Sequence, residues 1–411
     1  MNNNLKLFGL RPEKGRWFFI ILGLLIYICL GSVYSWSIFR KPLENLFNIG
    51  ATKSSMPYMI FLVFFSFFMP ISGNFLDKYG PKLVIATGGF FVGIGWILSS
   101  FAKNITMINL FYGVIGGAGV GIAYGGPIAI ATKWFPEKRG FAVGLIVIGF
   151  GLSPLITAPF SKMLIDMFGP LKTFLFLGLI FLFTIVLLAL LMKFPPSNWN
   201  VNNGNFLNND LDNNFNISEM LKSSSFYALW ICYAIGTTSG LMAIGISSPV
   251  GEEIIKISSN ISALAVSIFA IFNGLGRPIF GWLTDKISSK YTAIISFIIT
   301  FLASIGMINA GEGKIILYLI CFICFWLCLG GWLAIAPATT ANFYSTRNYS
   351  KKYGFVYTAY GFGAIIGNLI SGKAKDIFGS YIYTFYPIAI LSIFGILISF
   401  LLLNKPSIKK N

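Results

Sequence analysis

Arg277 is the residue of this sequence whose type and position point most directly to chemistry. It lies in a long apolar stretch, eight residues before Asp285, which corresponds to about 12 Å along a helix. Half of a bilayer's hydrocarbon layer measures about 15 Å, so we expect the guanidinium near the membrane midplane and no other charge so deep. An arginine at that depth costs about 2.5–3.5 kcal/mol on insertion scales and therefore needs a partner.

The sequence offers Arg277 no acidic or histidine partner at the same depth. The chain has no histidine, and its 13 aspartate and glutamate residues all fall in loops or near expected helix ends, which disfavours a proton relay through the protein. A visiting carboxylate would be a natural partner, because a guanidinium group binds both carboxylate oxygens. The alternative is that Arg277 reaches toward the membrane surface or binds backbone carbonyl groups freed near Pro278.

The charge of the site limits its ligand. One cation neutralises one carboxylate, whereas a dicarboxylate would leave a negative charge in a low-dielectric cavity. This favours monocarboxylates such as formate, lactate or pyruvate. Phenol and indole groups would supply polar tips and apolar walls, although each is also a common packing residue. The candidate substrate-binding residues are Arg277, Tyr34, Trp36, Tyr124, Trp332, Tyr357 and Tyr360.

No catalytic or metal-binding group accompanies these candidates in the sequence. Cys321, Cys324 and Cys328 have a spacing that superficially resembles a metal site, but the chain has no histidine and no carboxylate lies near them. Packing of an apolar helix is the better interpretation of these cysteines. We therefore expect no catalytic residue, no metal, no cofactor and no enzymatic activity.

The elements that position Arg277 are expected to be membrane-spanning helices. Hydrophobic residues make up 56% of the chain and charged residues 10%, against roughly a quarter in soluble domains. Long unbroken apolar runs favour helices over barrel strands, and 411 residues leave room for about twelve spans of about 20 residues. The expected spans are 17–39, 56–76, 83–101, 107–131, 141–163, 172–193, 226–248, 261–283, 291–309, 315–337, 353–372 and 383–403.

The formal net charge of +17 reflects membrane topology. The basic residues are scattered among loops and form no continuous face, which excludes nucleic acid as a partner. Most of them lie in segments on the same side as the N-terminus, so the positive-inside rule predicts that both termini are cytoplasmic. We expect a multi-pass protein of the cell membrane that contacts the lipid bilayer and a small organic anion and functions as a monomer.

Residues 194–225 differ in composition from the rest of the chain. This segment is polar and rich in asparagine, which is typical of a linker. It predicts three parts: a six-helix bundle in 1–193, a cytoplasmic linker in 194–225 and a second six-helix bundle in 226–411.

The two predicted bundles repeat a set of landmarks. Gly73, Asp77 and Lys78 follow the second span, and Gly281, Asp285 and Lys286 follow the eighth with the same spacing. The same order and spacing of these residues in both halves indicates an internal duplication in parallel orientation. The repeated Gly-x-x-x-Asp-Lys loop resembles the signature loop of the major facilitator superfamily.

The repeated loops suggest a conformational latch. The glycines allow close approach of helices, while Asp77 and Asp285 can pair with basic residues of the neighbouring bundle. Such pairs would hold one conformation and break in the other. The alternative is that the charges only set topology.

A narrower resemblance extends along nearly the whole chain. The motifs Tyr34-Ser-Trp36-Ser-Ile-Phe39, Ala123-Tyr124-Gly-Gly-Pro127, Asn273-Gly-Leu-Gly-Arg277-Pro and Tyr357-Thr-Ala-Tyr360-Gly are similar to those of the oxalate/formate antiporter family. The resemblance implies a carrier that exchanges small carboxylates and binds the substrate carboxylate through the arginine of its eighth helix. Oxalate-exchanging members carry a second cation, a lysine, where this sequence has Tyr360, which puts oxalate in doubt.

These features together predict an all-α membrane protein with the major facilitator fold. The function expected of it is secondary transport of small carboxylates, monocarboxylates in the first place, by alternating access and anion exchange. Two alternatives stay open: oxalate/formate-type dicarboxylate exchange, and a membrane carboxylate sensor that does not transport.

Overall fold

The computed structural model describes residues 7–196, 216–344 and 349–406, and within them not the side chains of Asn74, Asp77, Arg139, Tyr349 and Ser350. The described chain is almost entirely helical and contains no β-strand. The first-half helices are α1 (Pro12–Gly15), α2 (Trp17–Leu30), η1 (Gly31–Ser35), α3 (Ser37–Phe47), α4 (Ala51–Ser99), α5 (Ile105–Ile108), η2 (Asn109–Gly116), α6 (Gly117–Trp134), η3 (Pro136–Lys138) and α7 (Arg139–Leu191). The second-half helices are α8 (Ile217–Lys222), α9 (Ser224–Val250), η4 (Gly251–Ile255), α10 (Ser259–Ile287), α11 (Ser289–Ile308), α12 (Ile315–Tyr344), α13 (Tyr349–Phe378), η5 (Tyr381–Thr384) and α14 (Phe385–Leu402).

Two of these helices are long because each reverses direction at a glycine. Gly80 in α4 and Gly169 in α7 have φ values of +78°, a left-handed conformation that other residues rarely adopt. Proline follows each glycine, at Pro81 and Pro170, where it suits the start of a new helix. Each long helix therefore supplies two crossings joined by a tight turn.

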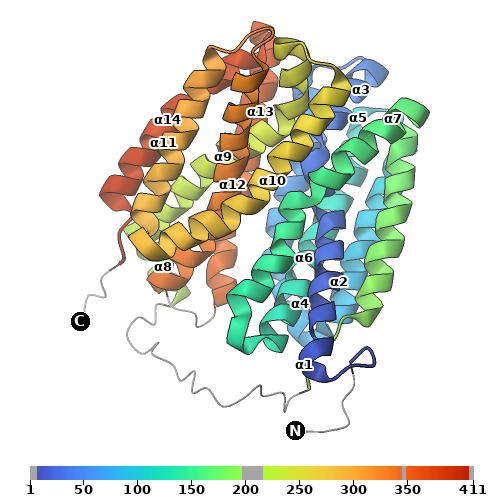
Figure 1. The fold of residues 1–411 in the computed structure, drawn as a ribbon, viewed down its shortest axis with the longest axis vertical. Helices are drawn as coiled ribbons and strands as arrows, with labels where there is room; N and C mark the ends of the chain where they lie inside the picture. The colour runs from blue at the N-terminus through green and yellow to red at the C-terminus, as the bar shows by residue number, and fades with distance from the viewer. Residues whose placement is uncertain (1–6, 197–215, 345–348, 407–411) are drawn as a thin grey trace.

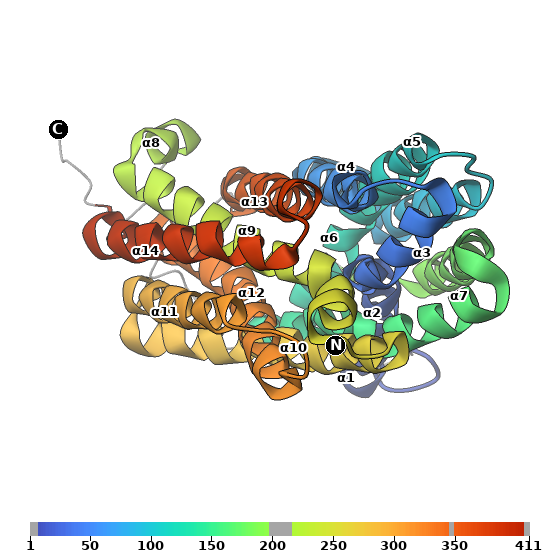
Figure 2. The ribbon, with the colours of Figure 1, turned by 90° about the horizontal axis from the view of Figure 1, so that it is seen from above.

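The described residues contain ten stretches that are long and apolar enough to span a membrane. One of them, Gly140–Leu191, bends at Gly169 and accounts for two crossings. The remaining crossing is α13, whose apolar residues are interspersed with glycine, tyrosine and asparagine. Figures 1 and 2 show these helices gathered in two bundles, which confirms the predicted all-α fold of twelve spans.

The linker prediction is not tested by the structure. Residues 197–215 lie outside the described part of the chain, and the short helix α8 occupies the end of the predicted linker. The Asn216 side chain and Glu219 form a capping box at the start of α8, and Met220 is buried. The boundaries 1–193, 194–225 and 226–411 therefore stay a prediction.

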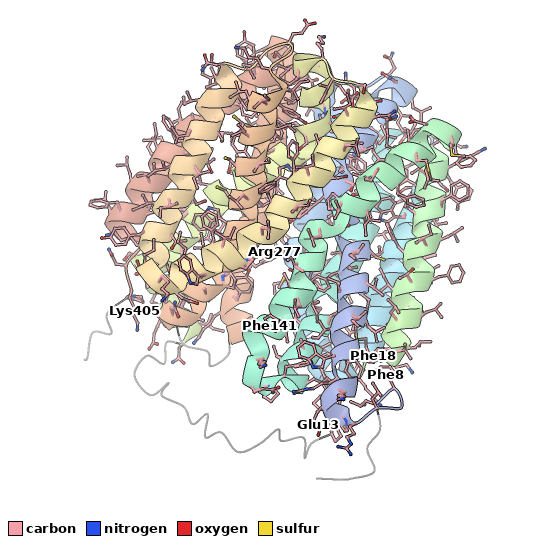
Figure 3. All side chains as sticks on the ribbon, viewed as in Figure 1. Phe8, Glu13, Phe18, Phe141, Arg277 and Lys405 are labelled. Carbon is pink, nitrogen blue, oxygen red and sulfur yellow. The ribbon has the colours of Figure 1, made fainter. Side chains whose placement is uncertain are left out.

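The two ends of the bundle differ in how the halves meet. We call the end with α1 and Lys405 the terminal end, and the opposite end, with α3 and α5, the distal end (Figures 1 and 3). Near the distal end, α4 packs so closely on α13 that a Cβ at Gly372 would lie 2.6 Å from Thr52 Cα. Near the terminal end, a Cβ at Gly140 or Gly144 of α7 would meet no described atom within 4 Å. The halves pack against each other distally and, along α4 and α13, as far as Gly354, where a Cβ would lie 2.9 Å from Pro70 Cβ.

Candidate substrate site

Arg277 projects from α10 into the contact between the two halves. Figure 3 places it at mid-height of the molecule, and only 8% of the residue is exposed. Its Nη1 donates a hydrogen bond of 2.6 Å to the carbonyl oxygen of Val147 on α7, which belongs to the other half. The sequence left open that Arg277 binds backbone carbonyl groups near Pro278. The structure shows that it does bind a carbonyl group, but this group belongs to Val147 in the other half.

The remaining edge of the guanidinium group is open. Nε and Nη2 of Arg277 are buried and have no hydrogen-bond partner among the described residues, and no described carboxylate forms an ion pair with the group. A carboxylate bound side-on would use this edge, because Nε–H and Nη2–H point in parallel. The site thus presents two charge-assisted donors to a ligand.

Phenol rings from both halves lie near the Arg277 charge. The hydroxyl groups of Tyr34 on η1 and Tyr360 on α13 meet at 2.8 Å across the interface. Tyr357 stacks on Tyr360 with ring centroids 5.1 Å apart. Tyr34 and Tyr357 lie within electrostatic range of the Arg277 charge, and the Tyr124 hydroxyl is close enough to Arg277 to interact with it as a hydrogen-bond partner. Three of the six predicted aromatic residues thus lie near Arg277, and Tyr360 joins them through its contacts with Tyr34 and Tyr357.

The two predicted tryptophans lie elsewhere, each within one half. Trp36 stacks on Tyr112 at 4.6 Å, and its indole nitrogen donates to Ser54 O at 3.1 Å. Trp332 packs between Tyr233 and Phe297, with ring centroids 6.2 and 5.2 Å away. Among the described residues, neither ring packs against Arg277 or against Tyr34, Tyr124, Tyr357 or Tyr360, so both act as packing residues in this conformation.

Four aromatic residues that sequence analysis did not single out complete the enclosure. Phe150 lies edge-on to Tyr34 at 5.0 Å, and Trp326 lies 6.4 Å from the same ring. The other two are Tyr27, whose hydroxyl donates to Tyr124 O at 2.5 Å, and Phe65, which contacts Tyr124, Tyr357 and Tyr360. Tyr27 precedes Tyr34 by seven residues, two helical turns, a spacing that identifies a shared face. The other three have no such signal.

Arg277 is not the only buried guanidinium group, although it is the one that lies at mid-height. Arg40 on α3 is fully buried near the distal end. It donates to Ser54 Oγ at 3.1 Å, to Gly245 O at 3.1 Å and to Ala51 O at 2.8 Å. Since each nitrogen has a partner, Arg40 is a structural tie between α3 and α9, whereas Arg277 has an edge free for a ligand.

Further polar contacts join the halves around Arg40. Glu253 of η4 forms ion pairs with Lys41 of α3 and, at 2.6 Å, with Lys375 of α13. The carboxylate of Asp376 accepts hydrogen bonds from the backbone amides of Ala51 and Thr52, at 2.8 and 2.9 Å, at the start of α4. A carboxylate at a helix N-terminus satisfies free amides and opposes the helix dipole. We call Arg40, Lys41, Glu253, Lys375 and Asp376 the distal clamp.

The predicted latch residues lie near the terminal end. Asp285 and Lys286 are exposed, and the described residues include no ion pair with either. Lys78 lies over the Tyr79 ring, and the Asp77 side chain is outside the described residues. The matching loop glycines have room beside them. A Cβ at Gly73 would meet no described atom within 4 Å, and a Cβ at Gly281 would lie 3.8 Å from Ala334 Cβ. The latch stays a prediction for another conformation.

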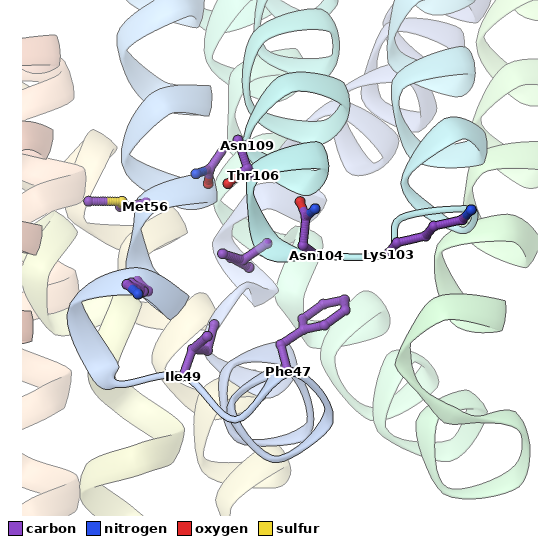
Figure 4. Close-up of a pocket in the computed structure, with 9 residues that line it drawn as sticks. Phe47, Ile49, Met56, Lys103, Asn104, Thr106 and Asn109 are labelled. Atoms are coloured by element: carbon purple, nitrogen blue, oxygen red, sulfur yellow. The ribbon is translucent and has the colours of Figure 1, made fainter.

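A separate cavity of about 460 Å³ opens near the distal end within the first half. Phe47, Ile49 and Met56 supply apolar walls, and Asn104, Thr106 and Asn109 line its inner side (Figure 4). Lys103 also borders this cavity, but in Figure 4 its side chain points away. The cavity does not include Arg277 or its phenols. Among the described residues, no group of three or more His, Cys, Asp or Glu side chains is placed to hold a metal ion.

Two helical bundles in a membrane, with a buried cation between them and one end closed, have the architecture of a secondary transporter. The chain belongs to the Major Facilitator Superfamily, whose sequence profile matches residues 16–254 and 229–411. It is a transporter and not an enzyme.

The resemblance to the oxalate/formate antiporter family is confirmed by individual relatives. The chain is 29% identical over 368 residues to the oxalate:formate antiporter of Oxalobacter formigenes, covering 89% of this chain and 86% of the relative. It is 24% identical over 436 residues to monocarboxylate transporter 12 of Xenopus laevis, covering 97% and 92%. The crystal structure of a bacterial homologue of the human lysosomal transporter Spinster, inward-facing and unoccupied, shares the fold with a TM-score of 0.77 at 14% identity, over 98% of this chain and all of that one.

Proposed function

We propose that the protein carries small monocarboxylates across the cell membrane in exchange for one another. The observation that carries this proposal is the unpaired edge of Arg277, which lies at mid-height with phenol rings of both halves near its charge. Two parallel N–H groups on a fixed cation suit one carboxylate. The relatives support the same chemical class, because they include an oxalate:formate antiporter and several monocarboxylate transporters.

The surroundings of Arg277 favour monocarboxylates over oxalate. Tyr360, at the position where oxalate-exchanging relatives carry a lysine, is neutral and hydrogen-bonded to Tyr34. A second carboxylate would therefore meet aromatic rings and hydroxyl groups with no second cation, which is unfavourable in a low-dielectric site. A short apolar tail suits the faces of Phe65 and Phe150.

Alternating access follows from the asymmetry between the ends. The distal clamp closes one side of the site, while Asp285 and Lys286 at the terminal end are exposed and form no ion pair among the described residues. We propose that the opposite state opens the clamp and closes the Asp77 and Asp285 loops, with both termini in the cytoplasm.

Counterflow in reconstituted vesicles tests this function. Vesicles loaded with unlabelled anion should accumulate labelled formate, lactate, pyruvate or acetate when the same anion is inside. Labelled oxalate should accumulate much less. Oxalate as the preferred substrate would replace this proposal by dicarboxylate exchange, which the Oxalobacter relative favours. Saturable binding of these anions without counterflow would indicate a sensor.

A further inference from the structure

Tyr58 and Asn368 carry buried polar atoms that have no partner among the described residues. The hydroxyl of Tyr58, on α4, and Oδ1 of Asn368, on α13, are both unpaired, and each residue is at most 1% exposed. The amide nitrogen of Asn368 donates to Ala364 O at 2.8 Å. A Cβ at Gly245 of α9 would lie 3.1 Å from Asn368 Oδ1 and 3.4 Å from Tyr58 Cε1, so the two side chains converge on this glycine from opposite halves.

This pair lies between two layers of the transport path. On its distal side, the carbonyl oxygen of the same Gly245 accepts the hydrogen bond from Arg40 of the distal clamp. On its central side, Tyr58 lies within electrostatic range of Tyr34 and Tyr360, whose hydroxyl groups meet across the interface. A ligand that moves from the distal face to Arg277 therefore passes Tyr58 and Asn368 first.

The unpaired atoms are informative because leaving a buried polar group without a partner destabilises a fold. Apolar side chains would pack the closed interface better if closure were the only state these positions served. When the distal clamp opens, α4 and α13 separate, and the hydroxyl and the amide oxygen become free to meet a ligand or water. The unpaired hydroxyl and amide oxygen then destabilise the closed state because they serve to bind a ligand in the open state.

We propose that Tyr58 and Asn368 form a distal station that holds the substrate anion before it reaches Arg277. The inference rests on the proposed transport of monocarboxylates. The Tyr58 hydroxyl donates to the carboxylate, and Asn368 Oδ1 accepts from a hydroxyl group next to that carboxylate. A donor and an acceptor side by side match a 2-hydroxy monocarboxylate better than an acid with an unsubstituted alkyl tail.

Lactate and propionate test the distal station because they differ by one hydroxyl group. Uptake is measured separately from each face, in vesicles of defined orientation, for wild type, Tyr58→Phe and Asn368→Leu. The Tyr58→Phe variant should raise KM about tenfold for both anions at the distal face, since it removes the carboxylate donor. The Asn368→Leu variant should raise the distal KM about tenfold for lactate alone. At the terminal face, where Arg277 is met first, neither KM should change.

Tyr112→Phe is the matched control. The Tyr112 hydroxyl is also buried and unpaired among the described residues, but its ring stacks on Trp36 within the first half. Removing it should leave KM unchanged at both faces. Both Tyr→Phe variants should melt at or above the wild-type temperature, because each loses an unpaired buried hydroxyl.

The outcomes separate the station from the transport function itself. Equal changes of KM at the two faces, or an unchanged distal KM with wild-type uptake intact, would overturn the station and leave monocarboxylate transport standing. Wild-type vesicles that carry neither lactate nor propionate would overturn the proposed function, and the station with it.

Discussion

At the scale of single residues, the contrast between two arginines explains which one is available to a ligand. Arg40 and Arg277 are both buried, but Arg40 donates to three oxygen atoms, whereas two nitrogens of Arg277 lack a described partner. Burial alone therefore does not identify a binding residue. A charged group left partly unpaired is the stronger indication, since buried charges are otherwise satisfied.

The geometry of Arg277 leads to a first prediction. Arg277→Lys keeps the charge but loses the planar edge that binds two oxygens, so counterflow should fall at least about 100-fold, as one strong charge-assisted interaction is lost. Membrane insertion and melting temperature should stay near wild type. The measurement is counterflow of labelled substrate in proteoliposomes with equal protein content. Full activity of this variant would exclude carboxylate binding at Arg277.

Tyr360 leads to a second prediction, about selectivity. Tyr360→Lys places a second cation across from Arg277 and breaks the hydroxyl contact with Tyr34. Competition by oxalate should rise about tenfold or more relative to lactate, because a dicarboxylate is then neutralised. Tyr360→Phe is the control, which breaks the same contact without adding charge and should not favour oxalate. An unchanged competition profile in the lysine variant would contradict the charge argument.

At the scale of elements, the distal clamp joins pieces of five helices at one end of the molecule. The clamp works through helix ends: Asp376 near the end of α13 caps α4, and Glu253 of η4 lies between Lys41 and Lys375. Ties at helix ends break without unfolding any helix, so they suit a contact that forms in one state only.

The clamp predicts a shift in conformational balance. Glu253→Gln leaves Lys41 and Lys375 facing each other without their shared carboxylate, which should weaken distal closure by roughly 1–2 kcal/mol. A cysteine at Ser55, buried in α4, should then react several-fold faster with a membrane-impermeant maleimide applied to the distal face. Asp166→Asn is the control, because it removes the pair with Lys162 inside the first half. Equal labelling rates in both variants would show that the clamp does not hold the state.

The elements were largely predictable, but some of their details were not. Apolar runs identified the spans because hydropathy is read residue by residue along the chain. The sharp turns at Gly80 and Gly169 carry a local signal, the Gly-Pro pair, which sequence analysis did not use. Most of the predicted linker, residues 197–215, lies outside the described chain, so the structure does not test the linker prediction.

At the scale of the whole molecule, the hydrogen bond between Arg277 and Val147 joins the halves at a point that a substrate would affect. Arg277 of the second half donates to Val147 O of the first. Its Nε and Nη2 lie buried at the interface and have no partner among the described residues. When the site is empty, the protein must therefore change conformation with a buried positive charge that no anion neutralises. When a carboxylate is bound, the site is neutral during the conformational change.

This difference predicts exchange. Efflux of labelled anion into medium with unlabelled anion should be at least about tenfold faster than efflux into anion-free medium, because only loaded carriers reorient readily. The measurement is the time course of label loss from proteoliposomes under the two conditions. Equal rates would indicate uniport and contradict obligatory exchange.

The sequence by itself determined the class of this protein and singled out Arg277 as the candidate residue of its site. Composition, the repeated landmarks around Asp77 and Asp285 and the motif around Arg277 are local patterns, and they identified the fold and the family. Only the tertiary structure decided which partners Arg277 has, which aromatic residues surround it and which residues close the distal end. Val147, Tyr34 and Tyr360 lie 130 or more positions from their partners. Contacts over such distances depend on how the two bundles pack, which no local pattern of apolar and polar residues specifies.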